Sequence, residues 1–394
     1  MNNQTVKALV QGVMSDLGYS QVINNIQDVG PTILESNAIM NSFITSMINK
    51  VYQTIVVTKL FENPLSKFKK GSMPAGMFVE HSQINPAKAH DYESSGSDPN
   101  KKEISPFLAD DPDVAILYYS QNSQKRFELQ INEPLLVKAF QSWEAMGSLI
   151  EGIIQSLYNG SKIYQFETTK NLIGQDFSRE ESCAVCKQLP SPSDYDFSTQ
   201  LTEILRSDGL MLGFPSAEYN NYSAYAKTLI PPTGKTINTT PRITFTEPSA
   251  LNLIILADLS AKIDVEVLAN AFNLQKAEWL GSTTYVNDFG SCEKDTTAIG
   301  DMVADGVTKY HSTGKSGIFF TKDTDGKVYK YSLVAVLCDD AFIQIREILS
   351  RTDSCYNPKT LENNYFYHLW ESYSLSSFAN SLYYYFKQEV TELK

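Results

Sequence analysis

The chain has 394 residues and a formal net charge of −12, with 42% hydrophobic and 20% charged residues. This composition is typical of a folded protein, and the length predicts two or three domains. The negative charge argues against sequence-specific nucleic-acid binding, although an acidic surface can lie loosely beside DNA. An odd number of cysteines, five, does not indicate a disulfide framework. No signal-peptide pattern and no apolar run of about 20 residues is found, so we expect an unprocessed chain without a membrane span.

The N-terminal part combines a helix with a basic cluster. Apolar residues recur on one face of residues 36–51, which predicts a helix, and residues 52–60 have a strand-like composition. Residues 63–71 read Asn-Pro-Leu-Ser-Lys-Phe-Lys-Lys-Gly and stand out in an acidic chain. The cluster is either a solvated turn or a docking patch for an acidic surface on a neighbouring copy. It consists of Lys67, Phe68, Lys69 and Lys70.

A long polar segment follows. Residues 81–113 contain four prolines, and a structureless loop of this length is rare inside a compact domain. Strand-like alternation resumes at residues 127–131. We therefore interpret residues 65–131 as a two-stranded arm, which needs a partner surface because it cannot bury its own faces. A disordered surface loop is the alternative.

The middle of the chain has mixed helix and strand patterns. A long helix is predicted from Ser142 towards Leu172, with a weak point at Gly160. Prolines at 190 and 192 mark a boundary, and the short helix after them is expected to end before Gly209. Further elements are predicted as a buried strand at 251–256, a helix at 264–272, a strand at 282–287 and a hairpin turn at Asp325-Gly326. The aromatic-rich residues 365–386 are predicted to be strands.

Three short motifs resemble chemical sites, but each lacks a required part. Cys183 and Cys186 have zinc-ligand spacing, yet no second pair of ligands follows. Residues 233–236 resemble the end of a phosphate-binding loop, but its first glycine is missing and prolines flank it. Residues 323–326 resemble a calcium loop without its final glutamate. We therefore expect no catalytic residue, no metal and no cofactor.

Three segments carry a family resemblance. Residues 33–71, residues 251–289 (LNLIILADLSAKIDVEVLANAFNLQKAEWLGSTTYVNDF) and residues 363–384 (NNYFYHLWESYSLSSFANSLYY) resemble the major capsid, or head, protein of small short-tailed phages with protein-primed genomes. These phages infect Gram-positive bacteria. Residues 140–143, Phe-Gln-Ser-Trp, add a weaker fourth match. The three segments occur in the family's order and cover about a quarter of the chain.

The resemblance implies an α+β fold of the tailed-phage and herpesvirus capsid type (the Hong Kong ninety-seven type). It also implies that five structural parts follow one another along the chain. These are an N-terminal arm and helix at 1–64, an E-loop hairpin at 65–131, a peripheral domain with a spine helix at 132–189, an axial domain at 190–344 with an insertion at about 291–331, and C-terminal strands at 345–394 that return to the peripheral domain. Some relatives carry an immunoglobulin-like domain after these strands, and we expect it to be absent here.

The function that the resemblance implies is structural. The protein would self-assemble through hexamers and pentamers into an icosahedral head around double-stranded DNA, with scaffolding and portal proteins as partners. It would be assembled in the bacterial host cytoplasm and would reside in the virion, with no membrane association. A collar or fibre protein is an alternative. A second alternative, a nucleotide-binding enzyme that uses Lys235 and Thr236, is disfavoured.

Overall fold

The computed structural model places two compact units, each built from three chain segments. Unit 1 comprises Met1–Met77, Gln121–Thr169 and Ile345–Tyr373, and unit 2 comprises Phe78–Ser120, Lys170–Gln344 and Ser374–Lys394. The structure describes residues 3–19, 26–34, 61–74, 76–88, 112–120, 122–132, 154–178, 185–190, 197–225, 241–261, 281–290, 307–311, 317–322, 327–357, 359 and 362–390, with shorter stretches between 39 and 47, between 141 and 152 and at 302–304.

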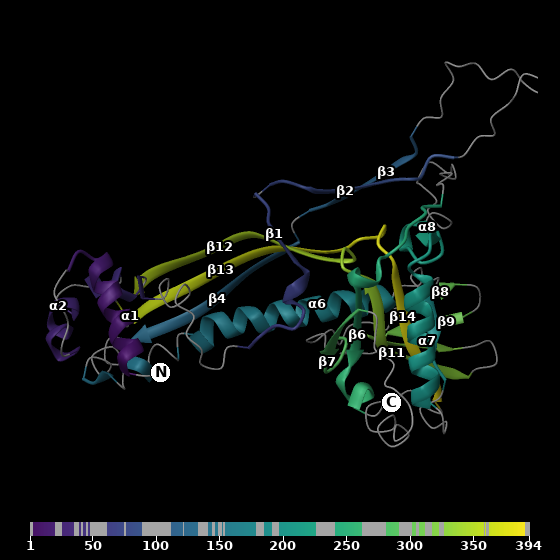
Figure 1. The fold of residues 1–394 in the computed structure, drawn as a ribbon. Coiled ribbons are helices and arrows are strands. Elements are labelled where there is room, and N and C mark those ends of the chain that lie inside the picture. The colour runs from purple at the N-terminus through teal and green to yellow at the C-terminus, as the bar shows by residue number, and fades with distance from the viewer. Residues whose placement is uncertain are drawn as a thin grey trace, which may run out of the picture. The chain divides into compact units, whose positions relative to one another are not determined.

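Unit 1 contains a four-stranded sheet in the order β1-β12-β13-β4. These strands are β1 (Lys69–Ser72), β12 (Ile343–Asn357), β13 (Glu362–Leu375) and β4 (Ser123–Asn132). β4 runs antiparallel to β13 over ten residue pairs, and β1 is parallel to β12. In Figure 1, β12, β13 and β4 lie side by side as long arrows. The sheet therefore joins an early, a middle and a late part of the chain.

The described helices of unit 1 include α1 (Asn3–Asp16), η1 (Ile26–Asp28), α2 (Gly30–Leu34), η2 (Ser66–Phe68), the π-helical turn η3 (Ile154–Asn159) and the first half of α6 (Gly160–Ser178). Apolar residues of α1 share one core with residues of β13, because the spacing of three and four residues puts them on one face. The members from α1 are Val6, Leu9, Val10, Val13 and Met14.

Unit 2 contains an eight-stranded sheet around one long strand. Its main path is β5-β14-β11-β10-β9-β8, and β6 pairs with both β11 and β7. One edge of β11 pairs with β14, while the other is shared by β10 and then β6. The strands are β5 (Cys186–Gln188), β6 (Leu251–Leu256), β7 (Ser282–Val286), β8 (Met302–Ala304), β9 (Val307–His311), β10 (Ile318–Lys322), β11 (Val328–Asp339) and β14 (Ser381–Val390).

Helices contact both faces of this sheet at β14. The described helices of unit 2 include the end of α6, α7 (Phe197–Met211), α8 (Asn221–Tyr225) and η5 (Pro248–Ala250). Side chains alternate across a strand, so neighbouring tyrosines of β14 point to opposite faces. Tyr383 donates a hydrogen bond to Asp176 of α6 (2.5 Å), and Tyr384 donates one to Asp208 of α7 (2.8 Å). The two helices thus hold β14 from opposite sides.

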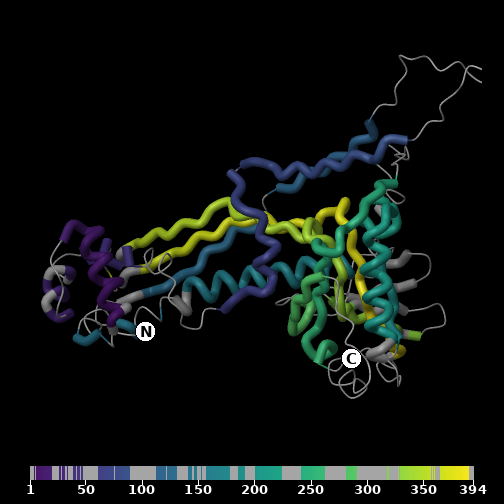
Figure 2. The backbone as a smooth tube through the Cα atoms, viewed as in Figure 1, coloured from purple at the N-terminus to yellow at the C-terminus, as the bar shows by residue number. Residues whose placement is uncertain are grey.

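A separate two-stranded sheet in unit 2 is formed by β2 (Val79–Ile84) and β3 (Val114–Tyr119). The strands are antiparallel, with Val79 opposite Tyr119 and Ile84 opposite Val114. The tube in Figure 2 shows the two strands running side by side. The strands of this hairpin span fewer residues than the arm predicted at 65–131, because β1 and β4, which lie in that range, belong to the sheet of unit 1.

The sequence predictions are largely confirmed where the structure describes the chain. The described residues between 39 and 47 are helical, the strands at 251–256 and 282–286 are present, and the aromatic C-terminal segment forms β13 and β14. Two helix bounds were wrong. α7 continues through Gly209 to Met211, and the long helix changes to a π turn at η3 and runs on to Ser178.

Other predictions fall on residues that the structure does not describe. These are the strand at 52–60, the helix at 264–272 and the turn at 325–326, although the antiparallel pairing of β10 with β11 brackets that turn. The range 345–394 contains strands of both units, since β14 lies in the sheet of unit 2. Within the described residues, no helix combines the length and hydropathy needed to cross a bilayer.

Candidate assembly surfaces

The basic cluster lies where η2 leads into β1. Phe68 is fully buried within unit 1, and the Lys67 ammonium lies 5.1 Å from the centre of its ring. Lys69 forms an ion pair with Glu347 of β12. The four predicted contact residues therefore do not form one outward patch. Lys67 and Lys69 are exposed and Lys70 is half-buried, whereas Phe68 serves the core of its own subunit.

Lys69 also lies near a buried carboxyl group of the same sheet. Glu371 is completely buried and accepts hydrogen bonds from Tyr373 Oη and Gln165 Nε2, each at 2.5 Å. Burial raises the pKa of Glu371, while the hydrogen bond from Tyr373 and the charge of Lys69 act in the opposite direction. Lys69 thus has an electrostatic role inside unit 1 that the sequence did not reveal.

The β2–β3 hairpin is attached to the body of unit 2 through its inner face. His81 Nε2 hydrogen-bonds to Gln344 Oε1 (2.8 Å), and its ring lies 4.7 Å from that of Tyr119. Gln83 Nε2 donates to the carbonyl of Ile243 (3.0 Å). Polar groups on this face therefore bond the hairpin to unit 2 at several points along its length.

A clamp joins the far end of the hairpin to residues 241–243. Asn85 and Asp113 close the ladder through a backbone hydrogen bond (3.0 Å) and a side-chain hydrogen bond (2.9 Å). The buried Arg242 forms an ion pair with the Asp113 carboxylate (2.8 Å) and donates to the Asp113 carbonyl (2.8 Å). Its guanidinium lies 5.6 Å from the centre of the Tyr222 ring. The hairpin is thus fixed to unit 2 by charged and neutral hydrogen bonds together.

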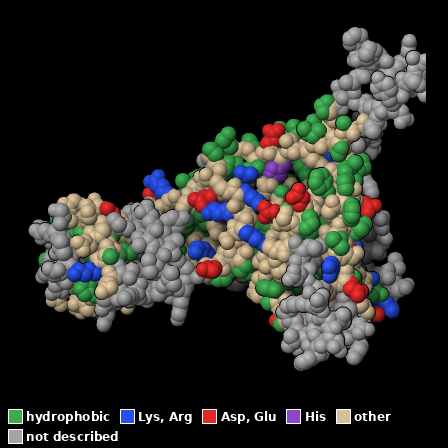
Figure 3. Space-filling model, in the orientation of Figure 1, with side chains coloured by type: hydrophobic (Ala, Val, Ile, Leu, Met, Phe, Trp, Pro, Cys, Tyr) green, Lys and Arg blue, Asp and Glu red, His purple; other side chains and the backbone are tan. Residues whose placement is uncertain are grey.

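The outer face of the hairpin is exposed and mostly apolar. Four of its six side chains are apolar and 43–64% accessible to solvent, and the other two are Glu80 and Ser82. The four apolar residues are Ile84, Val114, Ile116 and Tyr118. In Figure 3, hydrophobic side chains follow the hairpin and gather again over the neighbouring part of unit 2. A contiguous exposed apolar surface of this kind usually marks an interaction site. We call these four residues the hairpin row.

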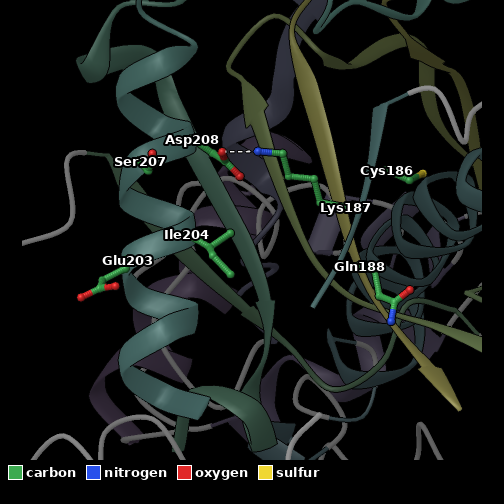
Figure 4. A pocket seen from close by; sticks show the side chains of 7 residues that line it. All are labelled: Cys186, Lys187, Gln188, Glu203, Ile204, Ser207 and Asp208. Carbon is green, nitrogen blue, oxygen red and sulfur yellow. Dashed lines mark hydrogen bonds and ion pairs between the residues drawn. The ribbon is translucent and has the colours of Figure 1, made fainter. Parts of the chain in front are cut away.

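The other conspicuous side-chain group surrounds Cys186. A cavity of about 640 Å³ is lined by residues of β5 and α7, as Figure 4 shows. Lys187 pairs there with Asp208, which already accepts the hydrogen bond of Tyr384, so these groups are used in packing. Cys186 forms no disulfide within the described residues, and Cys183 lies outside them, as do the motifs at 233–236 and 323–326. Across the described parts of the chain, no three His, Cys, Asp or Glu side chains gather as metal ligands would.

Comparison with known proteins identifies the family. The family described as "Phi29-like phage major capsid protein" matches residues 20–385. The chain belongs to this family. The major capsid protein of Bacillus phage PZA is 28% identical over 361 residues, which cover 91% of this chain and 66% of that protein. That of Streptococcus phage Cp-1 is 24% identical, covering 88% of this chain and 83% of that protein.

Solved structures show the same fold. A chain in the capsid structure of Staphylococcus phage Andhra superposes with a TM-score of 0.55 at 14% identity, covering 84% of this chain and 87% of that one. A chain in a structure described as the head fiber and inner core protein of native bacteriophage P68 gives 0.55 at 15% identity, covering 84% and 86%. The predicted α+β capsid fold and the family resemblance are therefore confirmed. The chain matches only 66% of the length of the Bacillus phage PZA and B103 proteins.

Proposed function

We propose that this protein is a structural subunit that self-assembles, in many copies, into the icosahedral head of a phage around double-stranded DNA. The family match over residues 20–385 carries the proposal. A shell of identical subunits needs surfaces that are stable but exposed in the isolated subunit, and the hairpin row has this property. Assembly in the host cytoplasm, with scaffolding and portal proteins as partners and the virion as the final location, is part of the same proposal.

Within this proposal the parts of the fold receive roles. The β2–β3 hairpin acts as the E-loop and lays its row of apolar residues on a neighbouring copy. α6 is the spine helix, the four-stranded sheet of unit 1 is the peripheral domain, and the eight-stranded sheet of unit 2 is the axial domain. The insertion proposed at 291–331 includes β8, β9 and β10, which extend that sheet. The net charge of −12 supports loose, non-adhesive contact with packaged DNA.

The decisive experiment is assembly of the chain with its scaffolding partner. We expect closed shells in electron micrographs and a fast-sedimenting fraction. A chain that remains monomeric under all such conditions would contradict the proposal. The role of the hairpin row is tested by Ile116→Ser combined with Tyr118→Ser, which we expect to reduce shell yield while the isolated subunit keeps its melting temperature. Tyr285→Ser, at a residue 52% exposed on β7, is the control for loss of surface apolar area.

The basic cluster gives a second test of the same function. Because Lys69 forms an ion pair with Glu347 of the same subunit, the intersubunit hypothesis is tested with Lys67→Glu and Lys70→Glu together, which leaves that ion pair intact. We expect fewer shells and a stronger dependence of yield on salt, since exposed charge contacts are weak singly and screened by ions. The control, Lys327→Glu with Lys359→Glu, changes the net charge equally. Equal shell yields from the two double variants would exclude the cluster as a contact.

A further inference from the structure

A short segment of unit 2 has an inverted pattern of burial. In residues 242–246 the polar side chains face inward and the apolar ones outward. Arg242 and Thr246 are 4% and 1% exposed, whereas Ile243 and Phe245 are 42% and 61% exposed. An extended segment normally turns its apolar face to the core. This one does the opposite.

A network of hydrogen bonds fixes the segment in this register. The backbone of Thr244 pairs with that of Ser216 in both directions, at 2.9 and 3.0 Å. Asn380 donates to the hydroxyl of Thr246 (3.0 Å) and accepts from that of Thr244 (2.5 Å). Asn220 donates to the Arg242 carbonyl (2.8 Å) and to the Thr244 hydroxyl (3.1 Å).

A shift by one residue would bury the apolar side chains, but it would break this network. Buried polar groups left without partners are costly, so the network opposes the shift. The outward display of Ile243 and Phe245 is therefore built into the fold and does not result from a lack of core space.

A second apolar group lies beside the first. Thr244 pairs with Ser216, and Thr246 N donates to Leu212 O (2.8 Å), so residues 212–216, which include Phe214, run beside residues 244–246. Phe214 is 63% exposed, and Leu210 and Met211, at the end of α7, are 49% and 47% exposed. The two phenylalanine rings alone expose about 250 Å² if each side chain offers roughly 200 Å². We call Leu210, Met211, Phe214, Ile243 and Phe245 the Phe214–Phe245 patch.

We propose that a second copy of this chain covers the Phe214–Phe245 patch in the assembled particle. The inference rests on the proposed shell function and adds a particular contact to it. None of the five patch residues is charged, so the patch suits another apolar protein surface and offers nothing to a phosphate backbone.

The same neighbouring copy can reach the hairpin row. Asn85, next to Ile84 of that row, accepts a hydrogen bond from Ile243 N (3.1 Å), so the row and the patch are joined through the clamp. The row and the patch together form one extended apolar surface on unit 2, suited to contact with a single neighbouring copy.

The test is a double variant, Phe214→Ser with Phe245→Ser, in the full chain coexpressed with its scaffolding protein. Both side chains are mostly exposed, so the isolated subunit is expected to melt close to the temperature of the Tyr285→Ser control. We expect at least a tenfold loss of sedimenting shells relative to that control. Shell yield equal to that of Tyr285→Ser would overturn the inference. The function itself fails only if the unaltered chain forms no shells.

A second measurement removes any dependence on folding of the variant. A photoreactive phenylalanine analogue placed at 245 in assembled particles is expected to form a covalent adduct of two copies of this chain. An adduct with a different protein, with lipid, or no adduct in well-formed particles would refute the inference. Mapping the cross-linked residue on the second copy identifies the surface that covers the patch.

Discussion

The clamp at the end of the hairpin offers a quantitative test of how the hairpin is held. We consider Arg242→Met, which keeps the volume over Tyr222 and removes the charge. The Arg242 side chain is 5% exposed and that of its partner Asp113 is 38% exposed. Removing one partner of a buried pair costs about 3–5 kcal/mol, and of an exposed pair less than about 1 kcal/mol. Because the Asp113 side chain is partly exposed and is hydrated once Arg242 is removed, we expect a free-energy cost of about 2 kcal/mol, between these two limits.

This cost should appear as local opening of the hairpin. A change of about 2 kcal/mol corresponds to roughly a 30-fold shift in the opening equilibrium. Amide hydrogen exchange of β2 and β3 should accelerate by about this factor, while exchange in β11 stays the same. Arg351→Met removes an ion pair whose partners are 66% and 41% exposed, and it should change exchange less than about threefold. Unchanged exchange in β2 and β3, or equal acceleration throughout the molecule, would refute the reasoning.

Three other changes test the interior. Glu371→Gln should stabilise the isolated subunit more at pH 7 than at pH 4.5. Burial raises the pKa of Glu371 in the folded protein above its unfolded value of about 4.3. The wild-type protein therefore loses stability as the pH rises from the unfolded pKa to the folded one, and the glutamine variant does not. Tyr384→Phe should cost about 1–3 kcal/mol in urea unfolding, since the buried Asp208 loses a hydrogen bond. Gly281→Ala should destabilise unit 2 by several kcal/mol, because the added Cβ would lie 2.2 Å from the Leu251 carbonyl oxygen.

Each of these three changes has either a control variant or a result that would contradict it. A difference between Glu371→Gln and wild type that does not vary with pH would contradict the assignment of the raised pKa. Tyr285→Phe, at an exposed position, should change unfolding by less than about 0.5 kcal/mol. Gly152→Ala places its Cβ in open space, so the comparison with Gly281→Ala separates crowding from the general effect of replacing glycine.

The sequence predicted those elements in which the pattern of apolar residues directly reflects which faces are buried. Residues 251–256 are apolar except for Asn252 because β6 is covered on both faces, and this pattern can be read directly. Helical spacing between 36 and 51 was recognised for the same reason. By contrast, α7 continues through Gly209 because its neighbours favour helix, and the cost of one interior glycine is only about 1 kcal/mol.

The surfaces were harder to predict because they depend on partners far away in the chain. Alternation in residues 242–246 is visible in the sequence, but only Asn220 and Asn380 decide which side faces the core. Similarly, β4 looked like part of the arm until its pairing with β13 placed it in the sheet of unit 1. Lys69 was recognised as unusual, yet its partner Glu347 is 278 residues away.

The sheet order has a consequence for the timing of synthesis. In unit 1, β12 and β13 complete strands made much earlier, and in unit 2, β14 lies between β5 and β11. Neither sheet can close until residues 343–390 have left the ribosome, and such distant pairings form slowly. A prematurely terminated chain would lack β14 and leave the facing edges of β5 and β11 unpaired. Unfinished chains would therefore expose unpaired strand edges, which chaperones and proteases recognise.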